Sequence, residues 1–316
     1  MMTTSCVGDN LETASYAWKQ QGLILAPDKS RDWMQSHVAV PVVEQLRGDI
    51  YRIYFCSRDS QNRSQIGYAE FDIRNPAEII YISPEPVLGL GELGAFDDNG
   101  VTPTWVLNRG KKKYLYYVGW NKGSTVRMHL YVGLAISEDG GQSFKRYSRA
   151  PILERVREDP LLTATLSILK ENGVYRMWYI SGDRWFSRAG ETFPVYNIKY
   201  AESRDAIHWA RKGQVCVDYK NAEEHALARP CVLKENGIYK MWYSYKGADY
   251  RIGYAESRDG LHWKRMDERV GIDVSSDGFD SIMQEYAFVV SRKGRKYMFY
   301  NGNDYGLKGI GYATCD

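Results

Sequence analysis

Gly253-Tyr-Ala-Glu-Ser-Arg-Asp-Gly-Leu-His-Trp263 is the clearest copy of a phrase that recurs along the chain. Related copies start at Lys199 and Gly133, and shorter ones read Gly67-Tyr-Ala-Glu70 and Gly311-Tyr-Ala-Thr314. The copies lie about 54 to 66 residues apart, a spacing typical of propeller blades rather than of helical repeats. Because the blades of a propeller converge on one axis, polar residues from distant parts of the sequence can meet around a single pocket.

Each copy of the phrase lies within a pattern of four predicted strands. Around Gly253, the inner strand is Pro230–Leu233, the second is Ile238–Tyr243, the third is Arg251–Glu256, and a fourth starts at Trp263. A Glu-Asn-Gly turn between alternating apolar residues is typical of a β-hairpin. No segment shows sustained helical periodicity, so the sequence predicts an all-β protein.

The two ends of the chain are complementary in this pattern. The stretch Trp18–Leu25 resembles the fourth strands that start at Phe144, Trp209 and Trp263, but no blade precedes it. The chain stops at Asp316, just after a third strand. We therefore predict one five-bladed β-propeller domain over residues 1–316, in which the N-terminal strand completes the last blade and removes two exposed edges.

The charge and hydropathy of the sequence argue against binding to nucleic acids and against insertion into membranes. The formal net charge is only +3, and basic residues do not cluster in runs. No stretch approaches the ~18 continuous apolar residues of a membrane helix. The first residues, Met1–Asn10, lack the basic and then apolar order of a signal peptide, so we expect a cytosolic protein.

The cysteines predict reduced thiols rather than a disulfide framework, because their number is odd and their spacing is wide. No CxxC pair is present, which argues against a zinc site. The five residues are Cys6, Cys56, Cys216, Cys231 and Cys315.

Three turns after predicted third strands carry a full or partial Asp-box pattern. The full version is Ser137-Glu-Asp-Gly-Gly-Gln-Ser-Phe144. We expect Asp139, Asp205 and Asp259 to accept hydrogen bonds from turn amides. These residues are predicted to lie on the outer rim, away from any chemistry.

The segments that enter the inner strands are rich in acids, and in a propeller such segments line the central funnel. Carboxylates that converge from different blades repel one another and shift one another's pKa values. Such a cluster can keep one acid protonated beside an ionised one, as cleavage of a glycosidic bond requires. The catalytic candidates are Asp97, Asp98, Glu224 or its neighbour Glu223, and Glu285.

Each acid also has a structural interpretation. Asp97 and Asp98 precede Gly100 and are suited to capping a turn. Glu285 is suited to a bond with a neighbouring arginine. At least one of Glu223 and Glu224 is expected to be solvated.

Cations and aromatic residues are interleaved with these acids. A fixed guanidinium near a carboxylate suits sugar hydroxyls, a carboxylate or a phosphate, and an aromatic ring can stack on a sugar. The alternatives are a solvated surface pair for Arg58 and Arg63, and packing between blades for Trp120. The predicted substrate-binding residues are His37, Arg58, Asp59, Arg63, Trp120, Arg229 and Tyr286.

At these residues the chain resembles the five-bladed propeller superfamily of glycoside hydrolase families 32, 43, 62, 68 and 130. More narrowly, it is similar to propellers labelled "glycosylase" that occur with polysaccharide biosynthesis genes. The phrases that carry the narrower resemblance are Trp33-Met-Gln-Ser-His37, Arg58-Asp-Ser-Gln-Asn-Arg-Ser64, Gly91-Glu-Leu-Gly-Ala-Phe-Asp-Asp98 and Tyr200-Ala-Glu-Ser203.

The superfamily resemblance implies three funnel acids: a base or nucleophile, a pKa-tuning Asp and a general acid. Two positions depart from it. Gln35-Ser-His37 stands where the first-blade Asp motif is usual, and Thr163-Ala-Thr165 stands where family 43 has its acid Glu. The remaining acids are the candidates named above, and the first-blade cations leave room for phosphate, as in the family 130 phosphorylases.

We therefore expect a glycoside hydrolase or glycoside phosphorylase, with Asp98 as general acid and Glu285 as base or modulator. Its expected partner is a carbohydrate, with phosphate as a second ligand, and neither nucleic acid nor membrane. No cofactor or metal is predicted, although calcium in the central channel is compatible with the sequence. The alternatives are a non-catalytic carbohydrate-binding propeller and a sugar transferase. The absence of a phosphate-cradling glycine loop argues against a nucleotide-dependent transferase.

Overall fold

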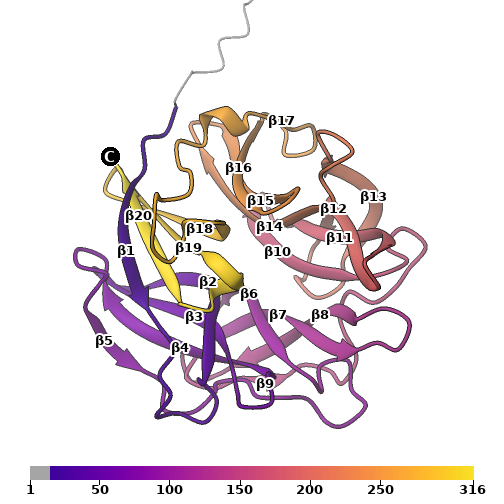
Figure 1. The fold of residues 1–316 in the computed structure, drawn as a ribbon, viewed down its shortest axis with the longest axis horizontal. Coiled ribbons are helices and arrows are strands. Elements are labelled where there is room, and N and C mark those ends of the chain that lie inside the picture. The colour runs from indigo at the N-terminus through magenta and orange to yellow at the C-terminus, as the bar shows by residue number, and fades with distance from the viewer. Residues whose placement is uncertain (1–14) are drawn as a thin grey trace, which may run out of the picture.

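The computed structural model describes residues 15–316, and this part of the chain is built almost entirely from β-strands (Figure 1). The exceptions are a 3-10 turn at Asp267–Arg269 and a one-turn helix, α1, at Asn303–Gly306. The prediction of an all-β protein is confirmed. No helix in the described range has the length and apolar character needed to span a bilayer.

The strands form antiparallel groups of four that follow one another along the chain. The first group consists of β2 (Ser36–Arg47), β3 (Ile50–Arg58), β4 (Ser64–Asp72) and β5 (Ile79–Ile82). The second group consists of β6 (Val101–Arg109), β7 (Lys112–Lys122), β8 (Met128–Ser137) and β9 (Lys145–Arg146).

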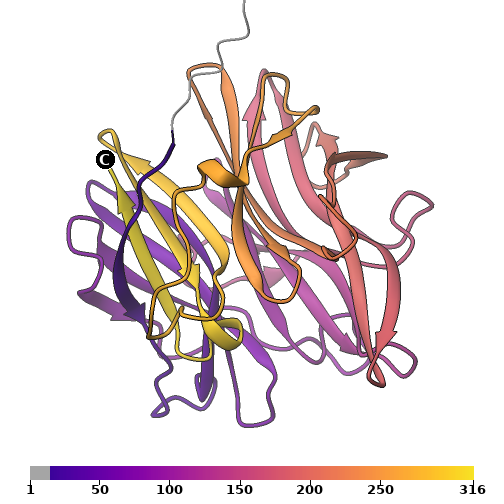
Figure 2. The ribbon, with the colours of Figure 1, turned by 45° about the horizontal axis from the view of Figure 1, so that its top comes forward.

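The third and fourth groups share one eight-stranded sheet, because a single parallel bridge pairs Tyr196 with Ala226. The hairpin of β11 and β12 is the longest in the described chain, and Figure 2 shows it extending at the lower right. The strands are β10 (Thr163–Glu171), β11 (Val174–Arg188), β12 (Glu191–Ser203), β13 (Ala210–Val217), β14 (Ala226–Glu235), β15 (Ile238–Lys246), β16 (Tyr250–Ser257) and β17 (Lys264–Arg265).

The last sheet contains strands from both ends of the chain. Its members are β18 (Glu285–Arg292), β19 (Arg295–Asn301), β20 (Ile310–Cys315) and β1 (Lys19–Leu25). Strand β1 runs antiparallel to β20, with Lys19 opposite Thr314 and Leu25 opposite Ile310. Figure 1 shows this indigo strand beside the yellow strands of the C-terminus.

The first strands of the five groups surround a common centre (Figure 1). Each of β2, β6, β10 and β14 contacts the next first strand, and β18 contacts β2. Each of these five strands also has a shift of register in its first half, as in Ala228 to Cys231 of β14. Such a bulge changes which face the neighbouring side chains occupy, and bulges are frequent next to active sites.

Aromatic side chains of the second strands tie adjacent groups together. The Tyr116 hydroxyl donates to the Ala206 carbonyl at 2.6 Å, and the Trp178 indole donates to the Gly260 carbonyl at 2.8 Å. Both carbonyls belong to Asp-box turns of the following group. Within these turns the carboxylates of Asp139, Asp205 and Asp259 accept bonds from backbone amides, which confirms the prediction for this motif.

Candidate functional site

A pocket of about 490 Å³ lies where the five first strands converge. Side chains from all five groups line it, among them Arg58, Trp120, Thr165, Lys246 and Tyr286. Its mouth is formed largely by the hairpin loops between second and third strands, because these loops leave the sheets at the same end at which the first strands enter.

Glu285 directly precedes the pocket-lining Tyr286 in β18 but does not itself line the pocket. In β2, β14 and β18, the last residues paired before the register shift are Ala39, Ala228 and Glu285. Ala39 and Ala228 line the pocket. The fifth group therefore places a carboxyl group where two of the other groups have a methyl group.

The Glu285 carboxyl group is completely buried, and neither of its oxygens makes a hydrogen bond of good geometry with a described residue. Burial raises the pKa of Glu285 well above its usual range. The cations Lys246 and Arg58 and the nearby Tyr286 hydroxyl oppose this shift only in part. Burial therefore favours the protonated form of Glu285.

Four tyrosines line the pocket, and three of them, Tyr196, Tyr250 and Tyr286, lie close enough to Glu285 to interact with its charge. The hydroxyls of Tyr196 and Tyr250 lie 2.6 Å apart, and the ring centroids of Tyr250 and Tyr286 lie 5.9 Å apart. The Lys246 ammonium donates a 2.7 Å bond to the Tyr305 hydroxyl. Burial raises the pKa of Tyr196 to about 12, so this phenol stays neutral and can donate or accept hydrogen bonds.

The charged side chains that line the pocket are cations. They are Arg58, Lys122, Arg127 and Lys246, and in the described part of the chain no Asp or Glu joins them. Burial, with a further contribution from Arg58, lowers the pKa of His37 to about 4, so this imidazole is neutral. A concave site with one sign of charge attracts ligands of the opposite sign.

Arg229 lies below the pocket and does not line it. It is fully buried, and its guanidinium donates to the carbonyl oxygens of Pro41 and Thr104, so it connects β14 to β2 and β6. It forms no ion pair with a described acid, and burial lowers its pKa to about 10. Its role is to hold first strands together and to add a positive charge beneath the cavity.

Asp97 is turned into its own sheet rather than into the pocket. Its carboxylate accepts bonds from the Tyr117 hydroxyl at 2.9 Å and from Arg146 at 2.7 Å. Asp159 has the same environment in the third group, with Tyr179 at 2.9 Å and Arg211 at 3.0 Å. We call this arrangement the Asp–Tyr–Arg clasp, because it joins the entering segment to the second and fourth strands.

Glu224 belongs to a variant of the clasp in the fourth group. Its carboxylate pairs with Arg265 at 2.6 Å, and Arg265 also pairs with Asp267. Asp267 in turn accepts a 2.5 Å bond from the Tyr243 hydroxyl. Glu224 is thus engaged in an ion pair and does not line the pocket, while Glu223 is exposed.

Asp98 lies at the edge of the pocket without lining it. Its half-buried carboxylate accepts bonds from the Gly94 amide at 2.9 Å and from the Asn121 side chain at 2.6 Å. Asn121 lines the pocket. Asp98 therefore contacts the pocket lining through the Asn121 side-chain amide and does not line the pocket itself.

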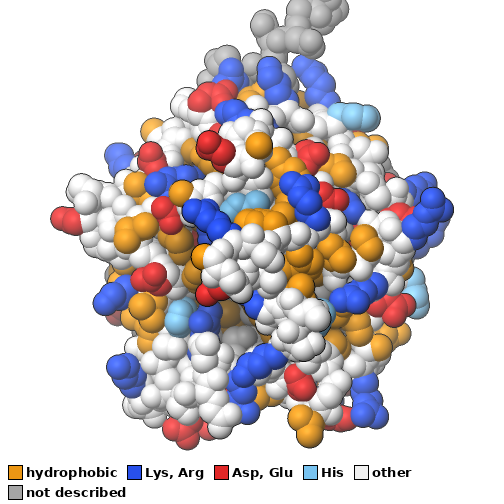
Figure 3. Space-filling view, turned by 45° about the vertical axis from the view of Figure 1, so that its right-hand side comes forward, with side chains coloured by type: hydrophobic (Ala, Val, Ile, Leu, Met, Phe, Trp, Pro, Cys, Tyr) orange, Lys and Arg blue, Asp and Glu red, His pale blue; other side chains and the backbone are white. Residues whose placement is uncertain are grey.

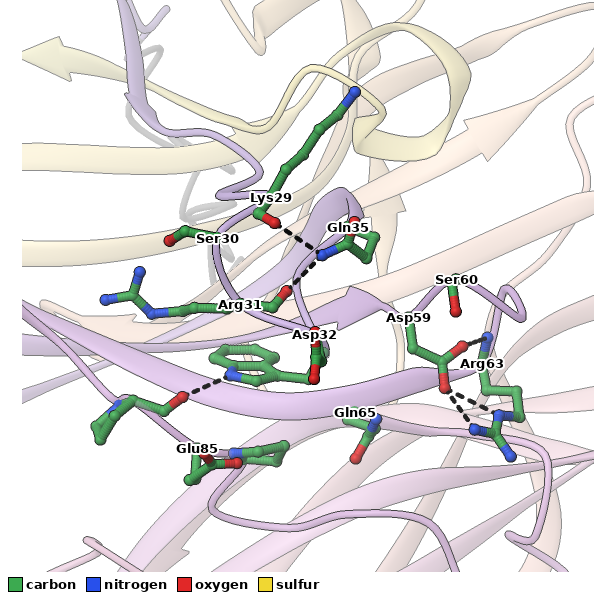
Figure 4. Close-up of a pocket in the computed structure, with 13 residues that line it drawn as sticks. Lys29, Ser30, Arg31, Asp32, Gln35, Asp59, Ser60, Arg63, Gln65 and Glu85 are labelled. Carbon is green, nitrogen blue, oxygen red and sulfur yellow. Dashed lines mark hydrogen bonds and ion pairs between the residues drawn. The ribbon is translucent and has the colours of Figure 1, made fainter.

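Six of the seven predicted substrate-binding residues divide between two hollows, and Arg229 lines neither. His37, Arg58, Trp120 and Tyr286 line the central pocket. Asp59 and Arg63, which form an ion pair at 2.8 Å, line a second hollow on the outer side of the β3–β4 hairpin (Figure 4).

Several pocket residues were not predicted from the sequence. Lys122, Arg127, Lys246 and Tyr305 all belong to loops or strand ends between second and third strands. In the first group, the cations of the loop between the second and third strands, Arg58 among them, indicate the pocket in the sequence. The corresponding loops of the other groups are the signal that predicts the remaining pocket residues.

Several residues that line the pocket have a left-handed backbone conformation. His37, Val40, Tyr286 and Tyr305 have left-handed φ values of 55°, 57°, 58° and 59°, and all four line the cavity. Such conformations cost about 1–3 kcal/mol each and cluster at functional sites. Packing against the neighbouring sheets must offset this conformational cost.

The described residues contain no group of three or more His, Cys, Asp or Glu side chains arranged to hold a metal ion. Four cysteines in this range, Cys56, Cys216, Cys231 and Cys315, are free thiols, while Cys6 and the segment Met1–Asn10 lie outside the described residues. Acidic and basic side chains are interspersed on the face shown in Figure 3.

No family model matches the chain. It is 41% identical over 300 residues to "Uncharacterized protein Rv1502" of Mycobacterium tuberculosis (strain ATCC 25618 / H37Rv), covering 95% of this chain and 99% of the relative. The chain belongs to the family of this mycobacterial protein. A 1,2-beta-oligomannan phosphorylase of Thermoanaerobacter sp. (strain X514) is 28% identical over 137 residues, covering 38% of this chain and 43% of the phosphorylase.

Solved structures share the fold at low sequence identity. A glycoside hydrolase superimposes with a TM-score of 0.76 at 19% identity, over 96% of this chain and 92% of the hydrolase. A thermostable family-43 glycoside hydrolase gives a TM-score of 0.64 at 18% identity, over 89% and 88% of the two chains. The predicted resemblance to the propeller-type glycoside hydrolases is confirmed at the level of fold.

Proposed function

We propose that the five groups are the blades of one five-bladed β-propeller domain. The successive contacts of the five first strands, from β2 through β18 and back to β2, support this architecture. The pairing of β1 with β20 supports closure of the ring by the N-terminal strand. Closure matters for function because the pocket takes side chains from every group and requires all five to keep their spacing.

We propose further that the protein cleaves a glycosidic bond by phosphorolysis, with Glu285 as the general acid. The observation that carries this proposal is a fully buried carboxyl group with a raised pKa, next to Tyr286 in a pocket whose lining charges are cations. A general acid must hold its proton at working pH, and burial is the usual means of raising a carboxyl pKa.

In the proposed reaction the Glu285 carboxyl group gives its proton to the glycosidic oxygen as the bond from that oxygen to the anomeric carbon breaks. An oxygen of hydrogen phosphate attacks the anomeric carbon. The products are a glycosyl phosphate and a sugar with a free hydroxyl group, and the proton carried by phosphate restores the acid. Arg58, Arg127 and Lys246 would hold the phosphate, since fixed cations stabilise transferring anions.

Phosphorolysis fits the charge of the pocket better than hydrolysis does. An inverting glycosidase needs a second carboxylate to activate water, and a retaining one needs a carboxylate nucleophile. Among the described residues, no carboxylate lines the cavity, and Asp97 and Glu224 are engaged in clasps. Phosphate carries its own negative charge and needs no such base. The partial similarity to an oligomannan phosphorylase supports the same class of reaction.

Asp98 has a positioning role in this proposal. Its 2.6 Å bond from Asn121 fixes the amide that faces the pocket. An oriented amide can both donate to and accept from sugar hydroxyls. Trp120, whose indole donates to Thr102 at 3.0 Å, is held as a wall on which a sugar ring can stack.

The test is a turnover screen with neutral oligosaccharides, including β-1,2-linked mannooligosaccharides, with and without inorganic phosphate. We expect glycosyl phosphate to form only when phosphate is present. Glu285→Gln should reduce kcat by at least ~10²-fold, the usual range for loss of general acid catalysis, and still bind the sugar. Asp98→Asn should have a smaller effect. Turnover that is independent of phosphate would assign a hydrolase instead.

One observation favours a second candidate, a carbohydrate-binding propeller without catalysis. Glu285 has no exposed surface, so its proton can reach a substrate only if a neighbouring side chain such as Tyr286 moves. Sugar binding with unchanged affinity in Glu285→Gln, together with no turnover in the native protein on any substrate of the screen, would select this candidate.

A further inference from the structure

A second hollow, of about 850 Å³, lies beside the central pocket and belongs to the first group alone. We call it the outer hollow. Its walls are the segment 29–35 before β2, the β3–β4 hairpin, and the segment 84–86 (Figure 4). Gln35 fixes the first wall, because its side-chain amide donates to the carbonyls of Lys29 and Arg31 at 3.0 Å and 2.7 Å.

The β3–β4 hairpin is the partition between the two hollows. Arg58, Asn62 and Ser64 line the central pocket. Their neighbours Asp59, Arg63 and Gln65 line the outer hollow. The turn at 59–63 and the extended chain that follows it from Ser64 thus present one set of side chains to each hollow.

The outer hollow differs from the central pocket in its charge. Its lining has three basic and three acidic side chains, namely Lys29, Arg31, Arg63, Asp32, Asp59 and Glu85. Balanced charge gives little attraction for an anion or a cation. It leaves many donors and acceptors, which is the chemistry that recognises a neutral polyol.

Part of this polar lining has no partner within the protein. The side chains of Lys29, Asp32, Gln65 and Glu85 make no hydrogen bond or ion pair with another described residue. Gln65 is half-buried, so its amide faces the hollow rather than open solvent (Figure 4). Arg63, by contrast, is held rigidly, because its guanidinium donates twice to the Asp59 carboxylate.

We propose that the outer hollow is a distal subsite that binds uncharged sugar units of an oligosaccharide whose reacting end lies in the central pocket. The substrate would then be a glycan chain that crosses the β3–β4 hairpin, and not a small glycoside. This inference rests on the proposed function, since the central pocket must hold the bond that is cleaved. Gln65 and Asp32 bind the distal units in this proposal.

The experiment measures affinity against chain length by calorimetry, without phosphate. The probes are neutral oligosaccharides of two to six units, β-1,2-linked mannooligosaccharides among them. Gln65→Ala and Asp32→Ala should weaken binding of the five- and six-unit chains by about 5- to 10-fold, the value of one or two lost hydrogen bonds. Disaccharide affinity should not change.

Asn62→Ala is the matched control, because it alters the same hairpin on the side of the central pocket. It should weaken short and long chains equally. Equal effects of Gln65→Ala on both lengths would overturn the distal subsite, and so would the absence of binding by every probe. If the protein binds longer chains more tightly but cleaves no substrate, the distal subsite stands and phosphorolysis is rejected. Failure of the subsite and failure of the proposed reaction can therefore be told apart.

Discussion

The side-chain amide of Gln20 donates a 3.1 Å hydrogen bond to the carboxylate of Asp280, 260 residues later in the chain. Asp280 also accepts a 2.8 Å bond from the Tyr300 hydroxyl. Gln20 thus stands in the last group where Arg146 and Arg211 stand in the Asp–Tyr–Arg clasps of the second and third. The N-terminal strand contributes to this sheet through its side chains as well as its backbone.

Gln20→Leu should lower the free energy of unfolding by about 0.5–1.5 kcal/mol, because the buried Asp280 carboxylate loses one donor but keeps those from Tyr300 and Gln284. Urea unfolding measures this change. The matched control is Gln21→Leu, which alters the adjacent exposed side chain whose bonds go to Lys19 and Thr314. A loss in Gln21→Leu as large as in Gln20→Leu would contradict a specific role for the bond to Asp280.

Asp97→Asn should destabilise the fold by about 3–5 kcal/mol, the cost of leaving a largely buried charged partner, Arg146, unpaired. Specific activity per folded molecule should be unchanged, because Asp97 lies within its sheet. Asp98→Asn should do the reverse, with less than about 1 kcal/mol of destabilisation and reduced activity through Asn121. Thermal unfolding and turnover of both variants separate the structural acid from its neighbour, and loss of activity in folded Asp97→Asn would refute the assignment.

Glu285→Gln should become more stable relative to the native protein as pH rises. The unfolded Glu ionises near its ordinary pKa, whereas the folded Glu keeps its proton well above that range. Between these two pKa values the folded state binds more protons, so native stability falls by up to about 1.4 kcal/mol per pH unit. Unfolding of both proteins from pH 5 to pH 8 tests this, and a pH-independent difference would show that Glu285 is ionised in the fold.

Arg229→Met should cost about 2 kcal/mol less stability than Arg229→Ala. Both variants remove the bonds to Pro41 and Thr104, but methionine fills the volume and adds no cavity. If phosphate binds above this buried cation, Arg229→Met should also weaken its binding. Chemical unfolding and phosphate titration measure the two effects. Equal stability of the two variants would show that the site collapses around the smaller residue.

The sequence by itself determined the local architecture of this protein. Repeats of the Gly-Tyr-Ala-Glu phrase located the third strands, and alternating apolar residues around Asn-Gly turns located the hairpins before them. The Asp-box residues Asp139, Asp205 and Asp259 could be assigned because their hydrogen bonds close within a few positions along the chain. Hairpin pairing and turn chemistry depend on residues that are neighbours in sequence, so the sequence pattern predicts both.

Only the tertiary structure decided which acids face the pocket. The bulge in each first strand shifts the alternation, so the orientation of Glu285 cannot be counted from its neighbours. Asp97 and Asp98 are adjacent in sequence, but one is held by Tyr117 and Arg146 and the other by Asn121. The protonation of Glu285 likewise depends on burial by residues of other groups, since desolvation is a property of the folded surroundings and not of the carboxyl group.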